Sequence, residues 1–241
     1  MAQSVQQPTP GLSPATANHL LGALETDDLA RLANDLEYVA LRPHDVLYEP
    51  HAAIEYVYFP TLGCVSMINI TPEGCVEVGT IGREGMVGVP ILLGAESEPT
   101  RALVQVDGDA YRIARAPFLE AIEASDAMQS ILLRYVMALF NQVAQSVACN
   151  RLHSLEARCA RWLLMTHDRV DGDKFELTQE FLSYMLGVHR PAVTLAAGLL
   201  QRAGFIHYTR GRISVTDRAG LERASCSCYQ ATRDDFASLA F

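Results

Sequence analysis

The stretch 177–217, LTQEFLSYMLGVHRPAVTLAAGLLQRAGFIHYTRGRISVTD, contains two helical segments separated by a sharp turn. Thr178 is a typical N-cap residue before the short segment QEFLSYML. Gly187 can adopt the left-handed backbone that a tight turn requires, and Pro191 is tolerated only in the first turn of a helix. A second helix is therefore expected to begin at 189–190, with two polar side chains at its exposed end.

This second helix carries an apolar stripe and is followed by an alternating segment. Four residues recur at the i, i+3, i+4, i+7 spacing that buries one face of a helix: Val193, Ala196, Ala197 and Leu200. Gly204 is suited to end the helix, and FIHYTRGRISVTD then alternates as two strands around 210–211. Upstream, SLEARCARWLLMTHDRV (154–170) predicts a further helix capped by Ser154. Helix, short helix, glycine turn, helix and hairpin together predict a winged helix-turn-helix.

In such a motif the second helix enters the major groove of DNA, and the residues of its first turns meet base edges. Arg190 can donate two hydrogen bonds to guanine, worth about 1–3 kcal/mol of discrimination. The preceding helix end and the basic hairpin residues are placed for phosphates. The predicted DNA-binding residues are Thr178, Gln179, Glu180, His189, Arg190, Thr194, Leu195, Arg210 and Arg212. The alternative is a winged helix that contacts only protein.

The charge of the chain is unevenly distributed. The formal net charge is -9, which by itself disfavours nucleic acid as a partner. Residues 1–150 carry 7 Arg and Lys against 18 Asp and Glu, whereas residues 151–241 carry 12 against 10. The basic excess therefore lies in the half that holds the predicted winged helix, as in nucleic-acid-binding modules. The composition, with 49% hydrophobic and 20% charged residues, is that of an ordinary globular protein.

Residues 39–115 differ from the rest of the chain in composition and in the spacing of turn residues. Short runs rich in Val, Ile and Tyr, such as AIEYVYFPTLG and ALVQVDGDAYRIA, are punctuated by Gly, Pro and Asp. Turn signals roughly every 8–12 residues are typical of an all-β sandwich or barrel. The region 18–38 before them repeats leucine at helical spacing, which predicts a short helical region.

The segment DAMQSILLRYVMALFNQVAQSVACN (126–150) predicts one long helix. Six residues follow a 4-3-4-3-4 spacing that is typical of a seam between helices: Met128, Leu132, Tyr135, Leu139, Gln142 and Ser146. We expect this seam to pair two copies of the chain, because the segment joins two domains and cannot hide its whole length on either. The alternative is a core helix that packs on its own β-domain.

The six cysteines, at positions 64, 75, 149, 159, 226 and 228, are scattered, and most are expected to be plain thiols. Cys226 and Cys228 form the only close pair. Residues two apart on a helix face away from each other, so this pair is expected to be a poor metal clamp, with redox sensing as the alternative. No CxxC motif and no four-ligand zinc spacing occurs, so no metal site is predicted. The seven histidines lack the His-x-His cluster of a cupin metalloenzyme, and no enzyme is expected.

From about residue 20 to 223 the chain resembles the Crp/Fnr superfamily of bacterial transcription regulators. The matching segments are PHDVLYEPHAAIEYVYFPTLGCV, the long helix and the stretch 177–217. The resemblance implies a homodimer formed along the long helix, and an effector in a β-roll that reorients the DNA-binding domains. It also places Arg190 on the guanine-reading arginine of the family, and Gln179 and Glu180 on phosphate-contacting positions.

The expected effector site departs from the family pattern. Members that bind cyclic nucleotides have a Gly-Glu pair, a short helix, and an Arg followed by Ser or Thr. This sequence offers IGREGMVG and PTRA, so Glu84 and Arg101 are the candidate effector-binding residues. Arg83 separates Gly82 from Glu84, and Ala102 lacks the hydroxyl that Ser or Thr supplies after the arginine, so cyclic AMP is not expected. Another small-molecule or nucleotide effector, or none, is left open, and no cofactor is assigned.

The sequence as a whole predicts an α+β protein in which a double-stranded β-helix (a β-roll) is joined by a long dimerisation helix to a winged helix-turn-helix. The expected parts are a flexible tail at 1–17, a sensor domain at 18–124, the helix at 125–150, the DNA-binding domain at 151–223 and a C-terminal extension at 224–241. No secretory signal or membrane-spanning run of roughly 20 apolar residues is found, so a cytoplasmic protein without a membrane partner is expected. Double-stranded DNA and a second copy are the expected partners, with RNA polymerase as a further candidate. The alternatives are a cyclic-nucleotide-binding-like sensor or adaptor without sequence-specific DNA binding, and a cupin-like metalloenzyme.

Overall fold

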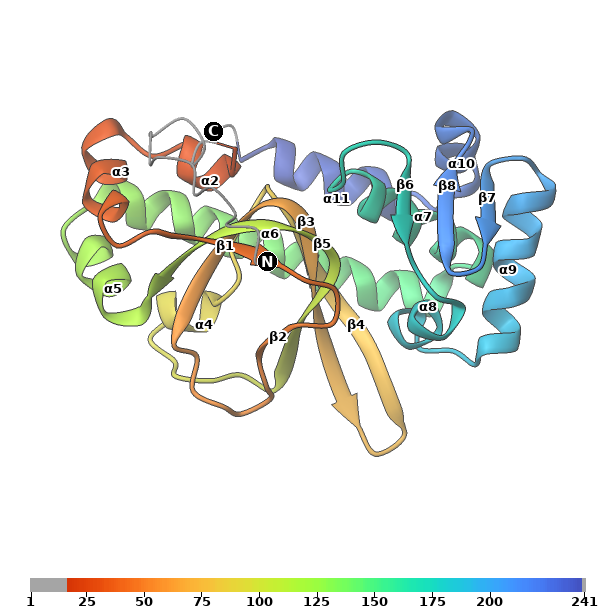
Figure 1. Ribbon diagram of the computed structural model, residues 1–241, viewed down its shortest axis with the longest axis horizontal. Helices are drawn as coiled ribbons and strands as arrows, with labels where there is room; N and C mark the ends of the chain where they lie inside the picture. Colours follow the sequence, from red (N-terminus) through yellow and green to blue (C-terminus); the bar gives the residue numbers. More distant parts are fainter. Residues whose placement is uncertain (1–16, 240–241) are drawn as a thin grey trace, which may run out of the picture.

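The computed structural model describes residues 17–239 of the chain. Figure 1 shows two lobes along the longest axis, with helix α6 (Asp126–Leu152) running behind the N-terminal, β-rich lobe and into the C-terminal lobe. Strands dominate the first lobe and helices the second, so the predicted α+β class is confirmed. The predicted tail at 1–17 lies outside the described residues except for its last position.

One antiparallel sheet forms the N-terminal lobe. Its strands are β1 (Glu37–Leu41), β2 (Val46–Tyr48), β3 (Tyr56–Thr71), β4 (Gly74–Ile81) and β5 (Thr100–Ala114). Their order is β1-β5-β3-β4, with β2 also paired to β5. The long strands β3 and β5 shift register three times between Pro60 and Val65. Such irregularities bend and twist a sheet, so the pair curls into a roll.

Two glycines let β3 and β5 approach closely at this bend. Gly63 has φ +77°, and a side chain there would meet the backbone oxygen of Asp107 at 2.5 Å. Gly108 on the other strand faces the Leu62 carbonyl in the same way. Because a Cβ atom does not fit at either position, the crossing of the two strands depends on these glycines.

Short helices close the ends of the roll. They are α2 (His19–Gly22), α3 (Thr26–Ala33), α4 (Val89–Leu92) and α5 (Arg115–Glu123). Leu20, Leu32 and Phe118 from these helices are at most 1% exposed and join the core of the roll. Asn18 caps α2 and donates from its amide to the carbonyl of Pro60 at 2.8 Å, which ties the helix to the sheet. The predicted helical region 18–38 is therefore two helices and the start of β1.

Helix α6 packs on the roll with the face that the heptad pattern assigned to a second chain. The six predicted seam residues are 0–9% exposed within the single chain: Met128, Leu132, Tyr135, Leu139, Gln142 and Ser146. The Tyr135 hydroxyl donates to the Met86 carbonyl at 3.0 Å, and the Gln142 amide accepts from the N–H of Thr80 at 2.8 Å. The predicted dimer seam is therefore wrong, because this face covers the core of its own lobe and its polar groups are satisfied there.

The C-terminal lobe is a winged helix-turn-helix. Its elements are α7 (Leu155–His167), β6 (Lys174–Glu176), α8 (Gln179–Leu186), α9 (Arg190–Arg202), β7 (Ile206–Thr209), β8 (Arg212–Val215) and α10 (Arg218–Ala224). The three strands form a small antiparallel sheet in the order β6-β8-β7. The predicted helices, glycine turn and hairpin are confirmed, and β6 is an addition to them.

A last helix, α11 (Cys228–Ala237), runs back along α6 toward the N-terminal lobe (Figure 1). The ring of Phe236 lies 6.3 Å from that of Tyr135 on α6, and Arg134 donates to the Leu239 carbonyl at 3.4 Å. The C-terminal extension thus contacts both lobes. Within residues 17–239, no helix combines the length and the apolar character needed to cross a membrane.

Candidate DNA interface

Local hydrogen bonds fix helix α8 and the turn that follows it. Thr178 caps the helix by accepting a hydrogen bond from the N–H of Phe181 at 3.1 Å. Gly187 ends the helix with φ +62°, as the predicted turn requires. The N–H of Val188 then donates back to the Ser183 carbonyl at 3.0 Å. The turn therefore sets the direction of α9 relative to α8.

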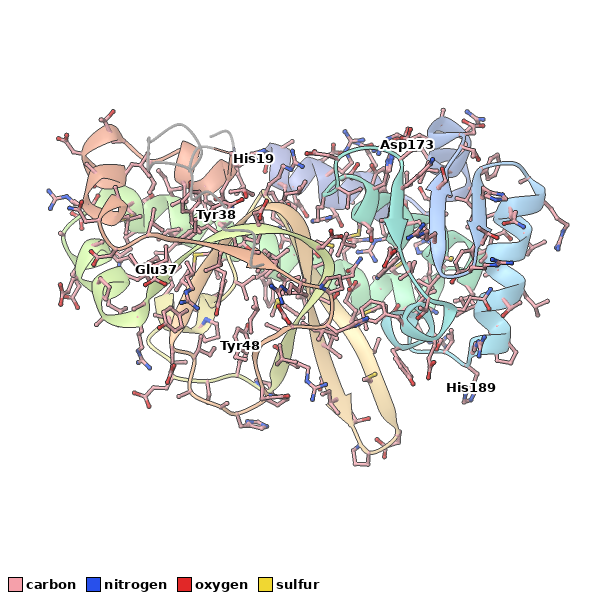
Figure 2. All side chains as sticks on the ribbon, viewed as in Figure 1. His19, Glu37, Tyr38, Tyr48, Asp173 and His189 are labelled. Carbon is pink, nitrogen blue, oxygen red and sulfur yellow. The ribbon has the colours of Figure 1, made fainter. Side chains whose placement is uncertain are left out.

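Helix α9 presents its N-terminal end and one face to solvent. His189 is the N-cap and Arg190 is the first helical residue, and both are exposed. Further along, Leu195 is 70% exposed and Leu199 is 42% exposed. The opposite face is buried, as predicted: Val193, Ala196, Ala197 and Leu200. Figure 2 shows His189 at the edge of the C-terminal lobe, pointing away from the rest of the molecule.

Thr194 connects α9 to the start of α8. Its hydroxyl oxygen lies 2.8 Å from Oε1 of Gln179 and 3.1 Å from the carbonyl oxygen of Arg190. The Glu180 carboxylate accepts a hydrogen bond from the Tyr184 hydroxyl at 3.0 Å. A carboxylate repels phosphate, so Glu180 suits a phosphate contact only through its backbone N–H, at the positive end of the helix dipole.

The hairpin of β7 and β8 forms the wing. Arg210 and Gly211 at its tip have φ +46° and +79°, the left-handed backbone of a type I′ turn. Arg212 forms two hydrogen bonds with Oε1 of Glu176, at 3.0 and 3.1 Å. Both partners are exposed, and an exposed ion pair is weak, so Arg212 can exchange Glu176 for a phosphate.

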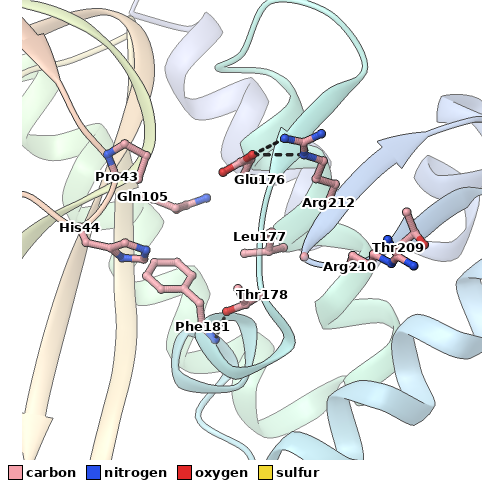
Figure 3. Close-up of a pocket in the computed structure, with 11 residues that line it drawn as sticks. Pro43, His44, Gln105, Glu176, Leu177, Thr178, Phe181, Thr209, Arg210 and Arg212 are labelled. Carbon is pink, nitrogen blue, oxygen red and sulfur yellow. Dashed lines mark hydrogen bonds and ion pairs between the residues drawn. The ribbon is translucent and has the colours of Figure 1, made fainter.

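The N-terminal end of α8 faces the N-terminal lobe across a cavity of about 480 Å³ (Figure 3). Six of the residues that line it come from the roll, from α8 and from the wing: Pro43, His44, Gln105, Thr178, Arg210 and Arg212. The His44 ring packs edge-on against the Phe181 ring, with centroids 5.6 Å apart. Three of the nine predicted DNA contacts therefore line this cavity.

Buried polar groups join the two lobes. Arg169, which follows α7, forms an ion pair with Glu84, with nitrogen–oxygen distances of 2.6 and 3.0 Å. Its side chain is 7% exposed. Glu77 of β4 accepts hydrogen bonds from the Trp162 indole at 2.9 Å and from the Ser66 hydroxyl at 2.6 Å. Burial raises the pKa of the Glu77 carboxyl from 4.5 to about 7, although both hydrogen bonds favour its ionised form.

Two family models match the chain. A Crp-like helix-turn-helix domain matches residues 157–224, and a cyclic nucleotide-binding domain matches residues 38–125. The matches fall on the C-terminal and N-terminal lobes respectively. The chain belongs to the Crp/Fnr family. It is a DNA-binding transcription regulator and not an enzyme.

Solved structures with the same fold cover most of this Crp/Fnr chain. FixK2 from Bradyrhizobium japonicum has a TM-score of 0.67 at 16% identity, over 79% of this chain and 98% of that one. A CRP-family transcriptional regulator from Thermus thermophilus has a TM-score of 0.62 at 19% identity, over 78% and 96%. CLP, a c-di-GMP-responsive global regulator of Xanthomonas campestris, has a TM-score of 0.60 at 13% identity, over 79% and 99%. A comparison with curated protein sequences gives no significant match.

The two residues predicted to bind an effector in this regulator have separate partners. Glu84 is held by Arg169, and Arg101 bonds Oε2 of Glu49 at 2.8 Å. Arg101 also lines a second cavity between the lobes, of about 510 Å³, together with Phe181 of α8. The predicted effector pair is therefore not assembled in this structure.

The structure gathers cysteine and histidine side chains that are scattered in the sequence: Cys149, His153, Cys226 and Cys228. Cys226 precedes α11 and only Cys228 lies in it, so the argument that two such residues face apart does not hold. The expectation that Cys226 and Cys228 face away from each other is therefore wrong, and the structure brings both of them beside Cys149 and His153. The signal available in the sequence is the Cys149-x-x-x-His153 spacing, one turn along the long helix.

Proposed function

We propose that this regulator binds DNA in the bacterial cytoplasm as a homodimer that reads two-fold-related half-sites with the N-terminal end of α9. The exposure of Arg190 at the first position of α9 carries this proposal. A guanidinium there can donate two parallel hydrogen bonds to O6 and N7 of a guanine. Leu195, exposed on the same face, suits contact with a thymine methyl group. The N-terminal end of α8 and the wing are proposed to contact the phosphates of the DNA backbone.

The proposed dimer seam is a second apolar stripe on α6, displaced from the buried one by one or two residues at each step. It consists of exposed residues at 4-3-4-3 spacing: Leu133, Met137, Phe140, Ala144 and Val147. Phe140 is 63% exposed and Val147 is 68% exposed. Large exposed apolar side chains in heptad register support pairing of the helix with a second copy of itself.

Selection of binding sites from random duplex DNA tests the proposal. We expect an inverted repeat whose half-sites are about one helical turn, roughly 34 Å, apart, with one dimer bound per site in sedimentation analysis. A direct repeat, or a monomer bound to a single half-site, would contradict the two-fold arrangement. If no sequence is enriched over the starting random pool, the result would favour a sensor or adaptor without sequence-specific DNA binding.

DNA binding is proposed to open the gap between the lobes. Thr178 faces the roll across the cavity of about 480 Å³, and His44 packs against Phe181 one turn into α8. A phosphate that binds the N-terminal end of α8 needs this space, whereas the exposed end of α9 does not change. The contact between the lobes therefore opposes binding of DNA phosphates at α8, and does not oppose contacts between α9 and the bases.

Cyclic AMP is not the proposed effector. The Glu84 carboxylate is engaged by Arg169, and Ala102 is fully buried and has no hydroxyl. Arg101 is the remaining candidate group, and an anionic small molecule in the cavity of about 510 Å³ would compete with Glu49 for it. Thermal-shift measurements with cyclic AMP, cyclic di-GMP and a set of anionic metabolites test this. We expect no shift with cyclic AMP, and any shift with another anion to be lost in Arg101→Ala.

A further inference from the structure

A cluster of sulphur and nitrogen donors lies where the long helix ends and the last helix begins. Cys149 and His153 are one turn apart at the end of α6, and His153 is its C-cap. Cys226 and Cys228 flank Ser227 at the start of α11. The sulphurs of Cys149 and Cys226 are 3.4 Å apart, and the Cys228 sulphur is 3.4 Å from Nδ1 of His153. All four donor atoms lie within 4.8 Å of one another.

We propose that these four side chains bind one zinc ion and so join the C-terminal extension to the long helix. Three thiolates and one imidazole form a Cys3His set, which structural zinc sites use. With zinc–sulphur bonds of about 2.3 Å in a tetrahedron, the sulphurs lie roughly 3.8 Å apart. The observed spacing is close to this value, so small side-chain rotations complete the coordination.

The number and type of donors favour zinc over other metals. Thiolates select soft or borderline ions, and four protein ligands leave no open position for water or a substrate. An iron–sulphur cluster holds its cysteines around several iron atoms, which requires donors farther apart than these. The three cysteines are buried and His153 is half-buried, so solvent has little access to the site.

The surroundings of the cluster suit a site that carries negative charge. The Gln145 amide donates to the Cys228 sulphur at 3.0 Å, as partners of metal-bound thiolates do. Arg158 and Arg161 of α7 line the same cavity as Cys149. Their Nε atoms are buried without a hydrogen-bond partner among residues 17–239. Glu77 also lines this cavity and is one acidic group beside the two arginines. Three thiolates and Zn²⁺ together are anionic, so a loaded site adds negative charge beside these guanidinium groups, which neutral thiols do not.

Zinc at this position would hold both lobes to α11. The first turn of α11 contacts the C-terminal lobe, where the Tyr229 hydroxyl donates to Asp168 at 2.9 Å. Its last turn contacts the N-terminal lobe, where Phe236 packs beside Tyr135. Loss of the metal is therefore expected to loosen α11 and to lower the melting temperature, because binding free energy of the ion contributes to folding.

A disulfide between Cys149 and Cys226 is the competing outcome, because their sulphurs are in contact. Its formation requires an external oxidant, forms one S–S bond and removes both thiolates from the donor set. The two states are therefore mutually exclusive and chemically distinguishable, since thiols bound to zinc are released by a chelator and a disulfide is not.

Metal analysis of the full chain tests the proposal. Protein purified with a reductant and without a chelator is expected to contain about one zinc per chain by plasma mass spectrometry. Cys226→Ser and His153→Ala are each expected to lower this content at least about tenfold. Cys75→Ser, which removes a half-buried thiol outside the cluster, is the matched control and keeps the zinc.

A second measurement does not depend on the folding of the variants. Wild-type protein stripped of metal and refilled with Co²⁺ is expected to show the thiolate-to-cobalt absorption of a tetrahedral sulphur-rich site. Wild-type protein that contains no zinc, and that gives no such absorption with Co²⁺, overturns the proposal. So does reduced protein in which alkylation and mass spectrometry still find Cys149 joined to Cys226.

Discussion

Helices α9 and α6 are both amphipathic, yet the sequence predicts the exposed part of one correctly and the covered face of the other wrongly. In α9 a single apolar stripe is buried and the tip at His189 and Arg190 is exposed. In α6 two stripes with heptad spacing lie side by side, and the one that begins at Met128 packs on the roll of the same chain. Heptad spacing shows that a face will be covered, but it does not show what covers it.

The two stripes of α6 give the largest expected difference. Met137→Glu combined with Phe140→Glu is expected to convert the dimer to monomers, because charges would lie in the proposed seam, while the stability of the monomer changes by less than about 0.5 kcal/mol. Leu139→Ala, in the buried stripe, is expected to cost about 2–5 kcal/mol and to leave a dimer. Sedimentation and denaturant unfolding measure both effects. The reverse pattern would return the seam to the residues predicted from the heptad.

The exposed tip of α9 gives the next effect. Arg190→Ala is expected to weaken discrimination at one base by about 1–3 kcal/mol in each half-site, because two hydrogen bonds to guanine are lost. Competition between the selected operator and a variant changed at that guanine measures the loss. Arg202→Ala, at the far end of the same helix, is the control and is expected to keep wild-type discrimination. Unchanged discrimination in Arg190→Ala would mean that the tip of α9 does not read bases.

Glu77 lies at the interface between the lobes. In the folded protein the pKa of its carboxyl group is raised from 4.5 to about 7, mainly because the group is buried. Below pH 4.5 both folded and unfolded chains hold the proton. As the pH rises toward 7 the unfolded chain loses it first, so the folded state loses stability across this window. Glu77→Gln is therefore expected to raise the free energy of unfolding at pH 8 by up to about 3 kcal/mol, and with it the melting temperature.

The same substitution is expected to change little at pH 4.5, where the wild-type carboxyl is also neutral. Thermal unfolding at both pH values makes the comparison, and Glu73→Gln, on the exposed turn before β4, is the control. An equal effect at both pH values would show that lost or gained hydrogen bonds to Trp162, and not ionisation, decide the outcome.

The contact between His44 and Phe181 gives the smallest effect. His44 has φ +72°, so His44→Asn removes the ring and keeps a residue that tolerates this backbone. If the contact holds α8 against the roll, the substitution is expected to raise operator affinity by about two- to twelvefold, since aromatic pairs contribute about 0.5–1.5 kcal/mol. His51→Asn, at another left-handed position on the roll, is the control. Weaker or unchanged binding in fluorescence anisotropy would contradict the proposed opening.

The correct and incorrect predictions differ in the range of the interactions behind them. Thr178, Gly187 and the Arg210–Gly211 turn act through bonds to residues a few positions away, so a single sequence reveals them. The partner of Glu84 is Arg169, which no spacing or period connects to it. Its role as a link between lobes therefore replaces its predicted role in an effector site only once the chain is folded.

By itself, the sequence determined the order of helices, turn and hairpin in the C-terminal lobe, because caps, glycines and helical periods are set by neighbours along the chain. Only the tertiary structure decided which stripe of α6 is buried and which side chains meet across the lobes. It also brought Cys149 and Cys226 into contact across 77 positions. Such contacts depend on how elements pack, and packing leaves no local pattern in the sequence from which it can be read.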